Sequence, residues 1–322
     1  MDLTQTTTST CSENEEETVE RDGVRMTKAE AKDAAEERYN AGQVAAANGT
    51  AISELDAETE AYADFKAGYD SSFIQANWEV ELTGNARDLY SLTQSGGMPD
   101  YFRVWGGIDD WNDCPSDRYS FNSLYFNGHH DPEVIWQYAY ELVSLFNGAS
   151  ELFGIRSRKQ VIREINFCGK PVQFKEQARV ISLLGRPPMS PRKWTEHLGK
   201  AIQTSPRLTL LILGTENEDV YMMLKYLGFE PSWSNYYKLL ETMETHAKLK
   251  GASVPGTAAA RERFTNNANN FSLVGYDARH GLKPAGKKNT VSVMTIEQAH
   301  DYISGACKAY LNTVYPEYFK LQ

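Results

Sequence analysis

The sequence predicts an α+β fold in which a region of strands and helices precedes an all-helical region. Between residues 77 and 174, strand-like alternation and helix-like periodicity follow one another in the order β-α-β-β-α-β. After the proline-rich residues 187–191 the strand-like pattern disappears, and the later segments have helical periodicity. Because crossover connections are right-handed, a ferredoxin-like split βαβ domain is the simplest packing of the first region.

The first 66 residues differ from the others in charge. They carry 6 of the 33 Lys and Arg residues and 16 of the 43 Asp and Glu residues, so the net charge of −10 belongs to this arm and 27 charges of each sign remain. Residues 1–24 are too polar to bury much surface, and we expect disorder there. Helices are expected at residues 27–47, with Thr27 as N-cap, and at 53–69.

These differences divide the chain into three parts. Residues 1–66 form an acidic, partly disordered and partly helical arm, residues 67–186 an α+β domain, and residues 187–322 a helical domain. A neutral body gives no bulk electrostatic signal for nucleic acid. The arm is expected to bind a protein partner, if it binds one, through its negative charge.

The elements of the α+β domain follow from local patterns. Trp78, Val80 and Leu82 alternate with polar residues and predict a strand over residues 77–84. Asp131 and Pro132 are typical of the N-cap and first position of a helix, which we place at residues 131–153. The other elements are a helix at 86–94 and strands at 101–107, 118–127 and 159–174.

The helical domain has equally clear start signals. Ser190 and Pro191 favour a helix that continues through residues 192–203, and Thr295 with Gln298 resembles a capping box. The predicted helices are at residues 191–203, 206–213, 218–229, 232–251, 258–270 and 295–315.

Several function classes lack their usual signals. The four cysteines include no CxxC pair, and no Walker A loop, GxGxxG, GxSxG, HExxH or EF-hand loop occurs, so we predict no cofactor. His129, His130 and Asp131 could ligate a metal, but Asp131 is explained as a helix cap and no second ligand cluster is visible, so we predict no metal site. Without a secretory signal or a long apolar segment, we expect a cytoplasmic protein without membrane contact.

Two constellations in the helical domain combine arginine with histidine. Arg192 and His197 have four residues between them, and Arg279 and His280 are adjacent. His can transfer protons near neutral pH and Arg can stabilise charge on phosphoryl oxygens, which suits phosphodiester cleavage. On a helix the first pair would project about 140° apart and the second about 100° apart, so either pair needs a loop, a kink or a helix end to act jointly.

The segments RFTNNANN, GYDARHG and MTIEQA, followed by a closing helix, resemble the C-terminal part of HEPN-like helical proteins of bacterial defence and toxin systems. The resemblance covers about residues 78–311 and implies a helical bundle that pairs with itself. In active members it implies metal-independent RNA cleavage by an Arg and a His four to six residues apart. The candidate residues are the catalytic pair Arg279 and His280, the alternative pair Arg192 and His197, and a nucleotide- or RNA-binding group of Asn266, Asn270, Asp277, Lys287 and Lys288.

The sequence leaves two hypotheses open. In the first, the chain is an RNA- or nucleotide-directed effector, a metal-independent ribonuclease acting as a homodimer in a toxin or phage-defence setting. In the second, it is a non-catalytic protein-interaction module regulated by the acidic arm. Arg279 would then pair with Asp277 or Glu297, and the asparagines would cap helices.

Overall fold

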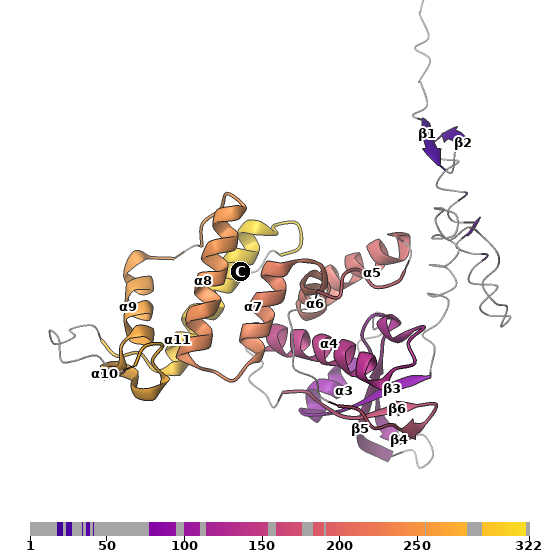
Figure 1. Cartoon of the computed structure of the whole chain (residues 1–322), viewed down its shortest axis with the longest axis horizontal. Helices are drawn as coiled ribbons and strands as arrows, with labels where there is room; N and C mark the ends of the chain where they lie inside the picture. Colours follow the sequence, from indigo (N-terminus) through magenta and orange to yellow (C-terminus); the bar gives the residue numbers. More distant parts are fainter. Residues whose placement is uncertain are drawn as a thin grey trace, which may run out of the picture. The chain divides into compact units, whose positions relative to one another are not determined.

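The computed structural model describes residues 18–21, 24–27, 34, 37–38, 41, 77–94, 100–109, 114–153, 159–175, 183–189, 191–254, 256–281 and 292–319 (Figure 1). The chain divides into two compact units, Met1–Ser72 and Phe73–Gln322.

The first unit contains an antiparallel hairpin of β1 (Thr18–Arg21) and β2 (Val24–Thr27). Arg21 pairs with Val24, so the two residues between the strands are Asp-Gly, which is a preferred sequence for a two-residue hairpin loop. The expectation of disorder is therefore wrong for the paired residues, and Thr27 ends a strand instead of capping a helix. The helices expected at 27–47 and 53–69 lie outside the described residues, apart from helical positions at 34, 37–38 and 41.

The second unit combines an antiparallel sheet with helices. The sheet order is β4-β5-β3-β6-β7, with β3 (Trp78–Thr83), β4 (Arg103–Asp109), β5 (Cys114–Asn122), β6 (Val161–Phe167) and β7 (Lys170–Pro171). The helices are α3 (Ala86–Gln94), α4 (Pro132–Leu152), α5 (Pro191–Thr204), α6 (Pro206–Glu216), α7 (Glu218–Gly228), α8 (Trp233–Leu249), α9 (Ala258–Asn269), α10 (Phe271–Val274) and α11 (Ile296–Val314), with the short 3-10 segments η1 (Leu124–Phe126) and η2 (Gly275–Asp277).

The expected α+β class and the order β-α-β-β-α-β from β3 to β6 are confirmed, but two strands differ from the prediction. The strand expected at 118–127 begins earlier and gives way to η1, because the Ser123 side chain accepts a hydrogen bond from the backbone N–H of Tyr125. The strand expected at 159–174 is two strands, β6 and β7. Cys168 and Gly169 have φ values of 49° and 73°, which close a tight turn between them.

A hydrophobic core joins the sheet to the helices. Trp78, Val80 and Leu82 of β3 are buried, as their alternation predicts. Helix α4 lies between the sheet and helices α6 and α7 (Figure 1). Its contact with α7 is close, since a Cβ on Gly148 would lie 2.0 Å from the Leu224 carbonyl oxygen. One core therefore contains residues from both sides of the domain boundary expected at residue 186. That boundary stays a prediction.

The predicted helix caps are present. Asp131 accepts a hydrogen bond from the backbone N–H of Glu133 at 2.9 Å, and Pro132 is the first residue of α4. Thr295 and Gln298 form a complete capping box at the start of α11. Within the part of the chain that the structure describes, every helix is too short or too polar to span a bilayer.

Candidate functional site

The first turns of α5 bring a lysine and a histidine together on one carboxylate. Lys193 and His197 are four positions apart and therefore project to the same side of α5. Both face Asp100, which lies in the loop before β4: Lys193 Nζ is 2.8 Å and His197 Nε2 is 3.6 Å from Asp100 Oδ2. We refer to Asp100, Lys193 and His197 as the α5 cluster.

The electrostatics of the α5 cluster keep Asp100 ionised. Burial alone would raise the pKa of this carboxyl, but the hydrogen bonds and charges of His197 and Lys193 outweigh it and lower the pKa to about 2. The side chains of Asp100, Lys193 and His197 are 25%, 27% and 17% exposed. The cluster is thus partly desolvated and still open to solvent, as a binding or catalytic group must be.

An aromatic wall supports the imidazole. The Tyr101 ring contacts His197 edge to face, with centroids 6.3 Å apart, and contacts Trp194 at 6.4 Å. Tyr101 is buried, its hydroxyl has no hydrogen-bond partner among the described residues, and burial raises its pKa well above the usual value. This wall limits the positions that the His197 ring can take.

The predicted pair Arg192 and His197 belongs to a single helix. Both lie on α5, but the side chain of Arg192 is outside the described residues. Because α5 is continuous, residues five positions apart project about 140° apart. Lys193 was not among the residues proposed from the sequence. It lies on the same side of α5 as His197, and their separation of four positions could have indicated this. Asp100 had no such signal, because it is distant in sequence.

In the predicted pair Arg279 and His280, the arginine has partners on a distant helix. The Arg279 guanidinium lies 4.2 Å above the Tyr237 ring, and its Nη2 is 3.5 Å from Glu241 Oε1. Both partners belong to α8, whereas Asp277 or Glu297 was the partner expected from the sequence. The chain after η2 folds back, and the Arg279 N–H donates to the Ala268 carbonyl at 2.8 Å. His280 is exposed.

The predicted nucleotide-binding group is described only in part. Asn270 caps α10 and accepts hydrogen bonds from the backbone N–H and hydroxyl of Ser272 at 3.2 and 2.8 Å. Asn266 is half-buried in α9, and Asp277 is exposed at the end of η2. Lys287 and Lys288 lie outside the described residues. The capping role expected of asparagine in the second hypothesis is confirmed at Asn270.

Asn267 is the buried member of the asparagine run. Its Nδ2 donates to the Arg263 and Ser292 carbonyls at 2.9 and 3.1 Å, and its Oδ1 accepts from the Met294 N–H at 2.9 Å. This side chain ties α9 to the segment that leads into α11. Its bonds are structural.

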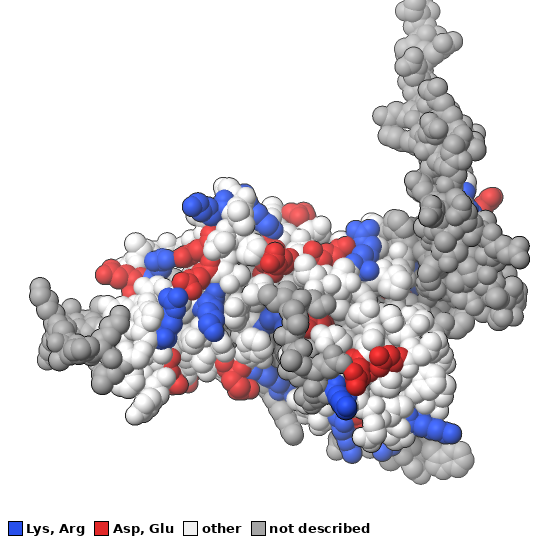
Figure 2. Space-filling view, in the orientation of Figure 1, with Lys and Arg blue, Asp and Glu red and all other residues white. Residues whose placement is uncertain are grey.

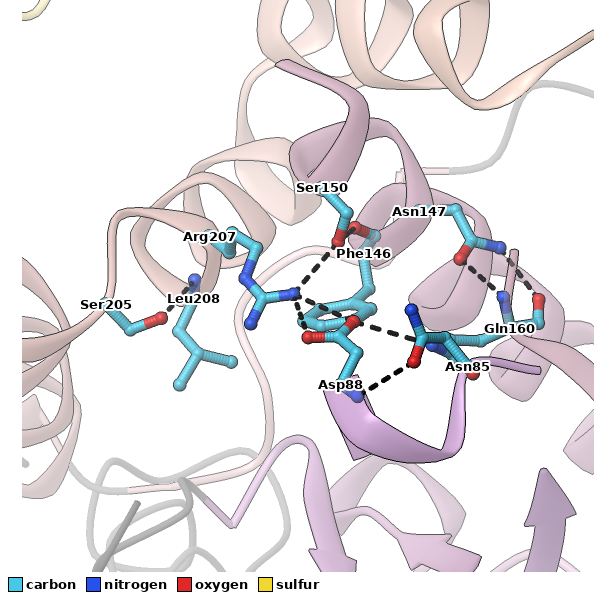
Figure 3. A network of polar contacts seen from close by, with 9 residues as sticks. All are labelled: Asn85, Asp88, Phe146, Asn147, Ser150, Gln160, Ser205, Arg207 and Leu208. Atoms are coloured by element: carbon cyan, nitrogen blue, oxygen red, sulfur yellow. Dashed lines mark hydrogen bonds and ion pairs between the residues drawn. The ribbon is translucent and has the colours of Figure 1, made fainter. Parts of the chain in front are cut away.

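A buried ion pair connects the two expected domains. Arg207 of α6 donates from Nη1 to both oxygens of Asp88 in α3, at 2.8 and 3.0 Å, and to Ser150 Oγ of α4 at 3.2 Å (Figure 3). The guanidinium also lies 4.9 Å from the centroid of the Phe146 ring. The Arg207 and Asp88 side chains are only 14% and 8% exposed. We interpret this pair as a structural link.

A second buried carboxylate connects three helices of the helical domain. Asp219 of α7 accepts hydrogen bonds from Lys250, Tyr310 and Tyr315, at 2.8, 2.5 and 2.8 Å for the shortest contact of each. Burial would raise the pKa of Asp219, but these bonds lower it; burial and the carboxylate raise the pKa of both tyrosines. The site joins α7, α8 and α11.

The surface charge of the helical domain is mixed. On the face drawn in Figure 2, basic and acidic side chains are interspersed and do not form a continuous basic field. This agrees with the equal numbers of charges beyond the arm. Within the described ranges, no three His, Cys, Asp or Glu side chains are grouped as a metal site would require. The ring of His129 packs against Tyr138 at 5.2 Å.

Comparisons of the chain with protein-family models, curated proteins and solved structures found no match. The function is therefore inferred from the side chains themselves. The α5 cluster combines an imidazole with a cation and partial exposure. Asp88 and Asp219, in contrast, are buried and paired.

Proposed function

We propose that this protein is an RNA- or nucleotide-directed effector that cleaves RNA without a metal ion, with the α5 cluster as its catalytic site. The observation that supports this proposal is the convergence of Lys193 and His197 on Asp100 at a partly exposed surface. The contact with Asp100 engages Nε2 of His197. It therefore orients the imidazole and leaves Nδ1 for a substrate proton.

The proposed chemistry needs only proton transfer and charge stabilisation. His197 accepts the proton of the ribose 2′-hydroxyl, the 2′-oxygen bonds to phosphorus, and the bond from phosphorus to the 5′-oxygen breaks. The leaving 5′-oxygen takes a proton from water, and the product carries a 2′,3′-cyclic phosphate. Lys193 stabilises the negative charge on the phosphoryl oxygens, the role that the sequence had assigned to an arginine.

The finer fold proposal is a ferredoxin-like split βαβ domain followed by a HEPN-like bundle that forms a homodimer. The strand order supports the first part, since β3 lies between β5 and β6, and β4 is outside β5. The bundle, its self-association and a toxin or phage-defence setting are supported by the resemblance of residues 263–270, 275–281 and 294–299.

RNA cleavage in EDTA tests the proposal. Purified full-length protein is incubated with single-stranded and structured RNAs, and the product ends are analysed for 2′,3′-cyclic phosphate. We expect cleavage by the unmodified protein and by His280→Ala, and its loss in His197→Ala. A folded protein that leaves all of these RNAs intact would refute it.

A second candidate function, a non-catalytic protein-interaction module, is favoured by one observation. The Arg279 guanidinium lies over the Tyr237 ring and faces Glu241, which is the structural role that this hypothesis gives to the arginine. In this case the acidic arm would tether or regulate a partner protein. Intact RNA together with arm-dependent binding of a basic protein would support it.

A further inference from the structure

We propose that Arg186 binds a second phosphate beside the α5 cluster, so that the ligand is a polynucleotide and not a mononucleotide. The inference depends on the proposed function for its RNA partner. It adds the substrate class, because a second phosphate contact increases the affinity for a chain of nucleotides and not for a single nucleotide.

The backbone that carries Arg186 is fixed. The N–H of Gly185 donates to the Thr215 carbonyl at 2.8 Å, and the Tyr125 hydroxyl donates to the Gly185 carbonyl at 2.5 Å. Both polar groups of the preceding residue are thus used. Gly185 has φ +69°, which glycine adopts without strain.

The Arg186 side chain is held with part of its guanidinium outward. Its Cζ lies 5.2 Å from the centroid of the Trp194 ring, and its Nε is 3.2 Å from Glu216 Oε1. The side chain is 49% exposed, and neither Nη atom has a hydrogen-bond partner among the described residues. Two parallel N–H donors suit phosphate oxygens, and a side chain already held in place loses less entropy on binding.

Arg186 belongs to the same surface as the α5 cluster. Trp194 lies on α5 between Lys193 and His197, and Tyr101 contacts both Trp194 and His197. Arg186 and His197 are therefore at opposite ends of one aromatic wall. Because two rings intervene, we assign the two residues to different phosphates of one strand.

A simpler explanation is that Arg186 only stabilises the fold through Glu216 and Trp194. An exposed ion pair of this kind contributes little to stability. The two explanations differ in RNA affinity, because a purely structural arginine would not change the number of phosphates that the protein contacts.

The test is the binding of a fluorescein-labelled single-stranded 12-nucleotide 2′-O-methyl RNA, which has no free 2′-hydroxyl and so cannot be cleaved by the proposed reaction, measured by anisotropy over a series of salt concentrations. Arg186→Gln should weaken binding about threefold to tenfold and reduce the slope of log Kd against log salt by about 0.7. Arg186→Lys should keep the slope and lose part of the affinity. Competition by a nucleoside monophosphate should not change in either variant.

Arg163→Gln is the matched control. Arg163 of β6 is 59% exposed and forms an ion pair with Glu81 of β3 at 2.7 Å. It should bind RNA as the unmodified protein does. Thermal unfolding of each variant identifies any misfolded protein. If Arg186→Gln is misfolded, Arg186→Lys is compared with the unmodified protein in its place.

Unchanged affinity and salt slope in a folded Arg186→Gln variant would overturn the inference, as would an unmodified protein that does not bind the RNA. Binding of the 2′-O-methyl RNA through Arg186, with RNA that has free 2′-hydroxyls left uncleaved, would support the inference and refute the proposed cleavage. The failures of the two proposals are therefore distinguishable.

Discussion

The buried pair of Asp88 and Arg207 makes a quantitative prediction about the link between the sheet and the helices. Arg207→Met removes the guanidinium, keeps most of the apolar stem, and leaves Asp88 buried without a cation. Removing one member of a buried pair costs about 3–5 kcal/mol. Arg207 also donates to Ser150 and stacks on Phe146. We therefore expect a loss of about 3 kcal/mol in the free energy of unfolding.

Urea unfolding followed by tryptophan fluorescence measures this loss, since all six tryptophans lie in the second unit. The control Arg163→Met removes a more exposed cation and should cost less than about 1 kcal/mol. The double variant Asp88→Asn with Arg207→Met leaves no buried charge and should recover part of the loss. An Arg207→Met variant as stable as the Arg163→Met control would refute the reasoning.

Three further predictions concern pH and packing. The pKa of Asp100 is lowered to about 2, so the stability that this carboxylate contributes, about 2 kcal/mol at most, should be complete above about pH 4 and be lost as the pH falls to about 2. Asp100→Asn should lose this contribution and keep the acid dependence that comes from Asp219, whose pKa is also lowered. Because the Tyr101 hydroxyl is buried without a described partner, Tyr101→Phe should leave the melting temperature unchanged or raise it, and a loss above about 1 kcal/mol would contradict this. Gly148→Ala should destabilise by about 1–3 kcal/mol because its Cβ would overlap the Leu224 carbonyl, whereas Gly305→Ala in α11, with open space around it, should stabilise by about 0.5–1 kcal/mol in the same thermal assay.

Local patterns predicted much of the second unit. The alternation of Trp78, Val80 and Leu82 indicated both a strand and its buried face, and Thr295 with Gln298 indicated the start of α11. These signals are local, since a strand or a cap is formed by residues near one another in sequence.

Turns were the main source of error. The Asp-Gly sequence between β1 and β2 is a hairpin signal that the acidic composition of the arm concealed. At Cys168 and Gly169 the sequence offered only one glycine, while the turn between β6 and β7 requires positive φ at both residues. Composition averages over a segment, whereas one tight turn decides its structure.

The candidate site was predictable only in part. The spacing of Lys193 and His197 can be read from the sequence, but their partner Asp100 is a tertiary contact. The same is true of Arg279, which follows η2 and whose partner Glu241 lies on α8. A charged side chain does not reveal its partner by sequence, because the fold decides which distant elements meet.

The most direct test of the central claim is the rate of RNA cleavage in EDTA by His197→Ala compared with His280→Ala. We predict that His280→Ala cleaves as the unmodified protein does, and that His197→Ala is slower by about 100-fold or more, the usual contribution of a general acid or base. Equal cleavage by the two variants, loss of cleavage in His280→Ala alone, or no cleavage by the folded unmodified protein would contradict the assignment of catalysis to the α5 cluster.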